Sequence, residues 1–440
     1  MDLNDSQKSP WRKDYSSWGG TFHFKHLVDL PQKASDLKEV LAGNNILPYG
    51  YGLSYGDVCL NDGGTLVDIS PLGRAISFEP NSGVLHAEAG LRMRDVLQIG
   101  LPHGWFLPVT PGTQGVSLGG AIANDVHGKN HHIEGTMGRH IIEMNLWRSD
   151  GSKTLLSPNT NQEMFAATVG GMGLTGIISD VKLQLKKGSG WITTETIKFE
   201  SLDEFDAISR SSDESFEYTV AWVDCLWSKG LRGHFMRGNH AEGIHRPCYS
   251  QAEKMAVRMF APQFLLNSWA IKSFNSLYYN RQIGKTKKAT VHYEPFFYPL
   301  DMISGWNKLY GKAGFFQYQF VIPLSEKEAL LEILRLIRNS GQGSFLAVLK
   351  KFGEVGSPGL LSFPQPGYTL ALDFPNRGQS TARLFRSLDQ VVFDAGGRLY
   401  PAKDSHMSAE MFQKSYPRWE EFLKYKDPKF SSSFLRRISA

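Results

Sequence analysis

Hydrophobic and polar positions alternate with a period of two in many short runs of the chain, a spacing typical of half-buried strands. In the N-terminal half these runs are residues 65–70 (TLVDIS), 75–79 (AISFE) and 84–90 (VLHAEAG). Asn81, Ser82 and Gly83 separate the last two runs, which predicts a β-hairpin with its turn there. The next pattern predicts a helix from Arg92 to about Gly100.

The C-terminal half alternates extended and helical patterns in a regular order. Extended segments are expected at residues 191–201, 217–226, 232–239, 315–323, 344–352, 368–375 and 398–402. Helices are expected at residues 202–211, 325–341 and 380–395. Ser325 and Glu328 form a predicted capping box at the start of the second helix, and Gly341 is its predicted end. The last six elements run β-α-β-β-α-β, which predicts an antiparallel sheet with helices on one face.

The same period separates the two faces of these strands, because alternate side chains leave a strand on opposite sides. The apolar set expected to meet the helices is Phe316, Tyr318, Phe320, Phe345, Ala347, Leu349, Leu370, Leu372 and Phe374. The opposite set is Gln317, Gln319, Leu346, Val348, Lys350, Thr369, Ala371 and Asp373. Glutamines and a lysine among small and aliphatic residues fit the wall of a sugar-phosphate site; an ordinary solvated face is the alternative.

Length, charge and cysteine usage narrow the class of protein. A chain of 440 residues is expected to form two domains, and a net charge of +5 is too small for a nucleic-acid binder. Cys59, Cys225 and Cys248 are few and far apart, so we expect neither a disulfide framework nor a cysteine zinc site. The sequence contains neither an apolar leader nor a run of about 18 apolar residues. A cytoplasmic location, with contact to a membrane surface as a further option, is therefore expected.

Two glycine-rich loops are the first indication of a ligand-binding site. Residues 50–57 (GYGLSYGD) follow an extended segment, and their backbone N–H groups can surround an anion such as a pyrophosphate. About 60 residues later, PGTQGVSLGG (111–120) again allows a close approach of backbone to a ligand. A glycine-rich surface turn would explain either loop alone, but the pair favours a binding site.

The order of motifs resembles the vanillyl-alcohol oxidase / p-cresol methylhydroxylase flavoprotein superfamily. The resemblance rests on the two loops, VLHAEAG, NDVHG, LWRSDGS and MFAATVGGMGLTGIISDVKLQL, between about residues 20 and 187. HGKNHH (127–132) and GGRLYPAKDSHMSAEMFQKSYP (396–417) narrow it to the decaprenylphosphoryl-β-D-ribose 2′-oxidase family. The implied fold class is α+β, with a two-domain PCMH-type FAD-binding fold and an antiparallel-sheet substrate domain. The implied divisions are an FAD-binding domain (1–188), a substrate domain (189–397) and a C-terminal segment returning to the FAD domain (398–440).

The resemblance implies a set of flavin contacts in both glycine loops and near the C-terminus. These are Gly50, Gly52, Leu53, Ser54, Tyr55, Gly56, Pro111, Gly112, Thr113, Val116, Ser117, Gly119, Gly120, Ala123, Asn124, His127, Gly128, Asn130, Gly173, Gly176, Ile177, Tyr400 and Lys403. Some relatives attach FAD covalently through a histidine of the first loop. Leu53 stands at or near that place, so FAD is expected to bind without a covalent bond.

The resemblance also implies oxidation of a sugar hydroxyl to a ketone on a lipid-phosphate carrier. The implied substrate contacts are Trp222, Gln317, Gln319, Leu346, Val348, Lys350, Thr369 and Ala371. Lys403 is expected to stabilise charge beside the flavin and Lys350 to contact a phosphate or hydroxyl, with Gln319 nearby. His127 has a suitable pKa for the catalytic base, a role that stays open. Ala371 and Thr369 replace a cysteine and an asparagine of mycobacterial relatives, so the exact substrate is open.

One interpretation of the three histidines in NDVHGKNHH is a metal site. His127, His131 and His132 lie in a glycine-containing loop and not at helical i, i+4 spacing, so no metal site is expected. The flavin-domain context instead places His127 nearest the redox centre, with Lys129 or Asn130 at polar edges of the ligand. His131 and His132 are as well explained by a structural role.

Residues 255–298 combine aromatic and aliphatic side chains with Arg281, Lys285, Lys287 and Lys288. Such a segment suits either a membrane interface or a lid over a pocket. The expected partners are a polyprenyl-phosphate sugar or another polyol, a short-chain NAD(P)H-dependent reductase that completes an epimerisation, and a membrane surface. The alternatives are a flavoenzyme acting on a soluble alditol or aldonolactone, and a non-redox sugar- or metal-binding protein.

Overall fold

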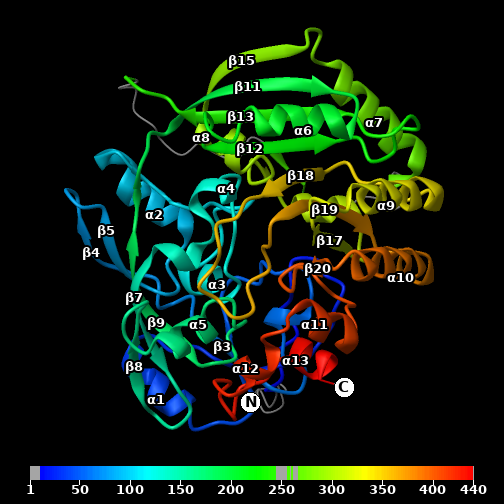
Figure 1. The fold of residues 1–440 in the computed structure, drawn as a ribbon. Coiled ribbons are helices and arrows are strands. Elements are labelled where there is room, and N and C mark those ends of the chain that lie inside the picture. Colours follow the sequence, from blue (N-terminus) through cyan, green and yellow to red (C-terminus); the bar gives the residue numbers. More distant parts are fainter. Residues whose placement is uncertain (1–9, 244–254, 258, 261–265, 440) are drawn as a thin grey trace, which may run out of the picture.

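Two groups of strands form the framework of the protein in a computed structural model, which describes residues 10–243, 255–257, 259–260 and 266–439 (Figure 1). The N-terminal part contains a parallel sheet in the order β1-β3-β2 and an antiparallel sheet in the order β4-β5-β9-β7-β8. The strands are β1 (Leu27–Asp29), β2 (Ile46–Tyr49), β3 (Thr65–Asp68), β4 (Ala75–Glu79), β5 (Val84–Glu88), β7 (Ile141–Trp147), β8 (Lys153–Leu156) and β9 (Ile177–Gln184). The helices are α1 (Leu37–Val40), α2 (Met93–Gly100), α3 (Leu118–Ala123), α4 (His131–Glu134) and α5 (Gln162–Thr168).

The predicted hairpin and the helix after it are both confirmed. β4 and β5 pair antiparallel, and Gly83 in the turn has a φ of 73°, a left-handed value that glycine adopts without strain. A Cβ at Gly83 would also lie 2.3 Å from the Trp105 ring, so this turn needs glycine for two reasons. The helix expected from Arg92 is α2, with Arg92 as its N-cap residue.

The C-terminal part is built on one eight-stranded antiparallel sheet in the order β15-β11-β13-β12-β18-β19-β17-β20. Its strands are β11 (Trp191–Phe199), β12 (Tyr218–Val223), β13 (Gly233–His240), β15 (Thr286–His292), β17 (Phe315–Ile322), β18 (Ala347–Phe352), β19 (Gly367–Pro375) and β20 (Arg398–Leu399). Two short pairs are β6 (Trp105–Phe106) with β10 (Lys186–Lys187), and β14 (Met255–Ala256) with β16 (Ile303–Ser304). In Figure 1 the sheet runs from β15 at the top down to β20, above the C-terminal helices.

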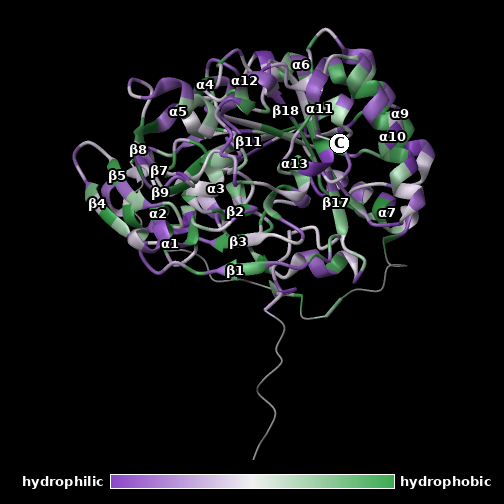
Figure 2. Ribbon diagram, turned by 90° about the horizontal axis from the view of Figure 1, so that it is seen from below, coloured by the Kyte–Doolittle hydropathy of each residue, from purple (hydrophilic) through white to green (hydrophobic). Residues whose placement is uncertain are grey.

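The helices of this half are α6 (Leu202–Arg210), α7 (Ser268–Asn280), α8 (Tyr293–Phe297), α9 (Lys327–Ser340), α10 (Gln379–Asp394), α11 (Ala409–Ser415), α12 (Trp419–Leu423) and α13 (Ser433–Ile438). The predicted β-α-β-β-α-β order is confirmed by β17, α9, β18, β19, α10 and β20. Buried residues of α6, α9 and α10 share one core with the predicted apolar strand face, so helices cover one side of the sheet. In Figure 2, α9 and α10 show both hydrophilic and hydrophobic stretches, as amphipathic helices do.

The capping-box prediction for α9 is wrong. The helix begins at Lys327 with Glu326 as N-cap, so Ser325 lies one residue outside the cap. Its hydroxyl instead donates to the Glu326 carboxylate at 3.2 Å. The predicted C-terminal end is confirmed, because Gly341 is the C-cap with a φ of 67°.

The C-terminal segment connects both halves of the molecule. β20 pairs with β17 in the large sheet, and Phe430 forms a bridge with Ile46 at β2. Arg437 of α13 forms an ion pair of 2.6 Å with Asp57, which follows the first glycine loop. Residues on either side of the first glycine loop therefore contact the end of the chain.

No helix in the described ranges has the length and apolar composition needed to cross a bilayer. Cys59 and Cys225 are free thiols, and Cys248 lies outside the described residues.

Candidate active site

A cavity of about 1030 Å³ lies between the glycine loops and the uncovered face of the large sheet. Its loop side is lined by residues of both glycine loops. Its sheet side is lined by alternate residues of β17, β18 and β11, and by further residues of β12 and β13. The strand face that the period of two predicted as a sugar-phosphate wall is therefore the face that lines this cavity. The face is enclosed and not an ordinary solvated one.

The first glycine loop leaves backbone donors unpaired at the cavity surface. In the described part of the chain, the N–H groups of Gly52 and Leu53 have no hydrogen-bond acceptor, whereas the Ser54 N–H donates to the Cys59 sulfur. Gly50 lies so close to the second loop that a Cβ there would stand 2.8 Å from the Ser117 hydroxyl oxygen. The Ser117 hydroxyl also caps α3 by accepting from the Gly120 N–H at 3.2 Å. Unpaired N–H groups that point at one space form an anion-binding surface.

The structure brings most of the predicted flavin contacts to this cavity. Those that line it are Gly50, Gly52, Leu53, Ser54, Tyr55, Pro111, Gly112, Thr113, Val116, Ser117, Gly119, Gly120, Ala123, Asn124, His127, Gly128, Gly173, Gly176, Tyr400 and Lys403. Three predicted contacts lie elsewhere. Gly56 packs against the Asp404 carbonyl, Asn130 donates to the Pro108 carbonyl at 2.8 Å, and Ile177 is fully buried in β9. These three residues are therefore not among those that line the cavity.

His127 and Gln319 form the polar centre of the cavity. The Gln319 amide nitrogen lies 3.0 Å from His127 Nε2 and 3.3 Å from the Thr369 hydroxyl oxygen. With the amide as donor to both atoms, His127 accepts at Nε2 and carries its proton on Nδ1. Thr369 is fully buried behind Gln319 and does not line the cavity, so its predicted direct substrate contact is replaced by a contact with Gln319.

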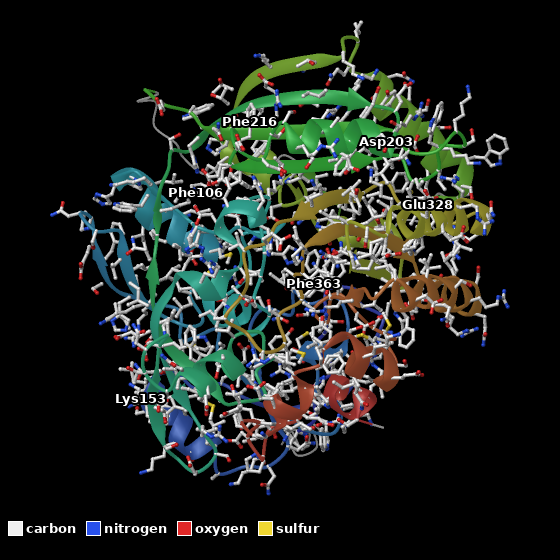
Figure 3. The ribbon with its side chains drawn as sticks, in the orientation of Figure 1. Phe106, Lys153, Asp203, Phe216, Glu328 and Phe363 are labelled. Atoms are coloured by element: carbon white, nitrogen blue, oxygen red, sulfur yellow. The ribbon has the colours of Figure 1, made fainter. Side chains whose placement is uncertain are left out.

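The expectation that His127 titrates near neutrality is wrong. Burial, followed by the charges of Lys350, His131 and Lys403, lowers the pKa of His127 well below 6.5. Its ring packs against Phe352, Phe363 and Tyr400 at centroid distances of 4.8, 5.6 and 5.2 Å. Phe363, labelled near the centre of Figure 3, belongs to the connection between β18 and β19. His127 is therefore a neutral hydrogen-bonding group at physiological pH.

Two lysines of the cavity have pKa values close to neutrality. Burial lowers the pKa of Lys350 to about 8. Burial also lowers the pKa of Lys403 to about 7, with Asp373 opposing that shift and Lys350 adding to it. The Lys403 ammonium lies 3.9 Å from the centroid of the Tyr55 ring. Both lysines can exchange protons near pH 7.

A buried carboxylate beneath this wall had no chemical role in the sequence prediction. Gln317 donates to Asp373 Oδ1 at 2.6 Å, and Asp373 Oδ2 has no partner among the described residues. Burial raises the pKa of Asp373 to about 7. Gln317 also hydrogen-bonds the side chain of Tyr55, the ring over which Lys403 lies. Asp373 and Lys403 are thus connected through Gln317 and Tyr55.

The remaining predicted substrate contacts lie on the cavity surface. They are Trp222, Gln317, Leu346, Val348, Lys350 and Ala371. Trp222 is held by its indole N–H, which donates to the Phe345 carbonyl at 3.0 Å. Next to these residues the wall becomes apolar through Val220, Met236 and the aromatic residues of α8.

Sequence reasoning missed several residues of the cavity, among them Asp301. Its carboxylate accepts from the Gln114 N–H at 2.8 Å and from the Thr113 hydroxyl at 3.1 Å, and so holds the second glycine loop. It lies 187 residues from Gln114 along the chain, so no local pattern could indicate this contact. Thr194 and Thr196 of β11 also line the cavity, and their period of two was the available signal.

The histidines after His127 have places outside the cavity lining. His131 stacks near Phe352 at 4.4 Å, and His132 Nε2 lies 3.1 Å from the Phe216 carbonyl. Within the residues that the structure describes, no three His, Cys, Asp or Glu side chains are arranged to hold a metal ion.

The cavity fits FAD by its own chemistry. Unpaired N–H groups of the first loop suit a pyrophosphate. Asn124 Oδ1 and His127 Nδ1 are buried without a partner in the described residues, so they offer an acceptor and a donor to polar ring edges. Lys403 supplies positive charge on the same surface. From this fit and the α+β fold we conclude that the chain is an FAD-dependent oxidoreductase.

Comparison with known proteins leads to the family. Residues 26–157 match a family model described as an FAD binding domain. The chain is 36% identical over 422 residues to a decaprenylphosphoryl-beta-D-ribose oxidase of Mycolicibacterium smegmatis, covering 90% of this chain and 89% of the relative. The chain belongs to the decaprenylphosphoryl-β-D-ribose oxidase family of FAD-binding proteins.

Two more distant relatives are named for lactones. An L-gulono-1,4-lactone dehydrogenase of Mycobacterium tuberculosis is 20% identical, covering 93% of this chain and 94% of the relative. A D-arabinono-1,4-lactone oxidase of Yarrowia lipolytica is 24% identical, covering 50% of this chain and 43% of the relative.

Proposed function

We propose that this chain oxidises the ribose 2′-hydroxyl of a polyprenylphosphoryl-ribose to a ketone. The supporting observation is the order of surfaces in the cavity. A polar cluster around His127, Gln319 and Lys350 adjoins an apolar wall that includes Val348 and Trp222. A lipid-linked sugar has the same order of polar and apolar parts. The name of the Mycolicibacterium smegmatis relative agrees with this substrate class.

The reaction needs a proton acceptor and an orienting surface from the protein. Bound FAD supplies the acceptor for the hydride that leaves the carbinol carbon. Gln319 and His127 are proposed to hold the hydroxyl, since their contact at 3.0 Å can open to include a substrate oxygen. Lys403 is proposed to accept the hydroxyl proton, because its pKa of about 7 keeps part of its population as the free amine. The resulting ammonium then stabilises negative charge on the cofactor.

The FAD is proposed to be held without a covalent bond. Leu53, at the place of the attachment histidine in some relatives, has no nucleophilic atom. Acid precipitation of the yellow protein is expected to leave the flavin in the supernatant. A yellow pellet with a colourless supernatant would contradict this expectation.

A membrane surface and a reductase are the proposed partners. Trp269 and Leu277 of α7 are 81% and 74% exposed, and Ile283 after the helix is 99% exposed. Lys285, Lys287 and Lys288 follow directly, so apolar side chains and cations share one region, as in interfacial helices. Residues 258 and 261–265 of the predicted interfacial segment lie outside the described residues. A short-chain NAD(P)H-dependent reductase would return the ketone to an alcohol of opposite configuration.

The substrate class is tested by anaerobic mixing of the holoprotein with two compounds. Farnesylphosphoryl-β-D-ribose is expected to bleach the flavin absorbance, whereas L-gulono-1,4-lactone at the same concentration is expected to bleach it far more slowly. Faster bleaching by the lactone would overturn the proposed substrate and favour the lactone class to which two relatives owe their names.

A further inference from the structure

Lys129 lies on the cavity surface between its polar and apolar parts. Its backbone is fixed to the large sheet, because its carbonyl accepts from the Thr219 N–H of β12 at 2.9 Å. Its side chain reaches α8, where the ammonium donates to the Phe296 carbonyl and lies 4.5 Å from the centroid of the Phe296 ring. One N–H of the ammonium is thereby used, and two are left for a ligand.

Lys350 approaches the same part of the cavity from β18. Burial, and then the charge of Lys350, lowers the pKa of Lys129 to about 7, so the two ammonium groups repel each other. Neither lysine has a carboxylate within 4.0 Å among the described residues. Two enclosed cations without a counter-charge are costly to bury, and an anionic ligand removes that cost.

The surroundings of the pair indicate which anion fits. On one side lie the hydrogen-bonding groups Gln319 and His127, and on the other lie the apolar side chains of Val348, Val220 and Met236. Gly52 and Leu53 of the first glycine loop line the same cavity, and their unpaired N–H groups are proposed to bind the pyrophosphate of the cofactor. A phosphodiester between a sugar and an isoprenoid chain matches the sequence of polar cluster, cation pair and apolar wall.

We infer that Lys129 and Lys350 together form the subsite for the phosphate of a lipid-linked sugar. The inference rests on the proposed function and adds Lys129, whose side chain spans from the sheet to α8. The phosphate bridges the two ammonium groups, which places the sugar toward His127 and the chain along the apolar wall. The subsite needs both lysines protonated, so affinity decreases as pH rises through about 7, where Lys129 loses its proton. His127 and His131 stay neutral over this range. Lys403 is a further cation that faces Lys350, and Arg94 and Arg281 also line the cavity.

The test uses two probes that differ in charge, each bound to the oxidised holoprotein and followed by the change in flavin absorbance. Decyl phosphate carries the anion and a tail, and decyl β-D-ribofuranoside carries the sugar and the same tail without charge. Lys129→Met is expected to weaken decyl phosphate binding about tenfold or more, because hydrogen bonds to charged groups are strong ones. Riboside binding is expected to change less than twofold. Lys129→Arg is expected to keep most of the phosphate affinity.

Matched variants separate a specific loss from a general one. Lys153→Met, in β8 far from the cavity (Figure 3), is expected to bind both probes as the unaltered protein does. Equal weakening of both probes in Lys129→Met would show a packing role and overturn the subsite, and so would an unchanged affinity for decyl phosphate. Neither measurement needs turnover. Lysine-dependent phosphate binding without oxidation of a lipid-linked ribose would therefore leave the subsite standing and reject the proposed reaction.

Discussion

Two catalytic roles are proposed for Lys403: it accepts the hydroxyl proton and then stabilises negative charge on the cofactor. Its amine lies over the Tyr55 ring, and burial among other cations keeps its pKa at about 7. A lysine with this pKa can accept a proton at neutral pH and is positively charged afterwards. Arginine keeps the charge but cannot accept a proton, because its pKa exceeds 12. Substitution of Lys403 by arginine therefore separates the two proposed roles.

Lys403→Arg and Lys403→Met are both expected to slow bleaching of the flavin by substrate by about 10² to 10⁴. In the unaltered protein the rate of bleaching at saturating substrate is expected to rise as pH increases through about 7, because the free amine is the active form. Stopped-flow rates at saturating substrate, measured for each variant and as a function of pH, test both effects. An arginine variant that retains most of the rate would restrict Lys403 to the electrostatic role inferred from the sequence.

At the scale of elements, α13 holds together two segments that line the cavity. Arg437 donates to the Asp57 carboxylate at 2.6 Å and to the Asp404 carboxylate at 2.9 Å. Asp57 follows the first glycine loop, and Asp404 follows Lys403. The Tyr55 N–H also donates to the Ala402 carbonyl at 2.9 Å, so the two segments are paired directly as well. These contacts hold Lys403 in its position over the Tyr55 ring.

Arg437→Met is expected to lower the free energy of unfolding of the holoprotein by about 3–5 kcal/mol, because it removes the cation from the buried Asp57 carboxylate and leaves the buried Asp404 carboxylate with His406 alone. Asp57 and Asp404 are only 3% and 4% exposed. Arg418→Met is the matched control, since Arg418 and Glu421 form an exposed pair worth at most about 1 kcal/mol. Urea unfolding of both variants provides the comparison. Equal effects of the two substitutions would show that the ion pairs of Arg437 contribute no more to stability than an exposed surface pair.

The strand faces could be predicted from the sequence because a period of two is a local property. This period assigns Gln317, Gln319 and Lys350 to one face of the sheet, and all three line the cavity in the structure. The family resemblance, and not the strand pattern, indicated that the two glycine loops contact the flavin. The failed capping box at Ser325 depended on a helix boundary, and an offset of one residue removes such a cap.

Contacts between distant segments were beyond sequence reasoning. Arg437 and Asp57 are 380 residues apart, and no pattern along the chain relates them. The pKa of His127 depends on burial and on cations brought together by folding, so its residue type alone gave the wrong expectation. Thr369 has the correct strand face, yet the side chain of Gln319 lies between it and the cavity.

At the scale of the whole molecule, α7 lies at the upper right of Figure 1, and Trp269, Leu277 and Ile283 of this region expose apolar side chains beside a run of lysines. The double variant Trp269→Ser with Leu277→Ser is expected to reduce cosedimentation with phosphatidylglycerol vesicles, because both exposed side chains lose their apolar area. Ile76→Ser is the control, since Ile76 is 52% exposed and belongs to β4, a strand on the side of Figure 1 opposite to α7. Unchanged cosedimentation of the double variant would show that this region does not bind the bilayer.

In the proposed reaction, ribose C2 of a lipid-linked sugar is the reacting carbon and lies between the cofactor and the His127–Gln319 contact. The most direct measurement is anaerobic bleaching of the bound flavin by farnesylphosphoryl-ribose carrying deuterium at ribose C2 or at ribose C3. Bleaching is expected to be slower with deuterium at C2 and to keep its rate with deuterium at C3. A slower rate only with deuterium at C3, or no bleaching by either compound, would contradict the proposed reaction.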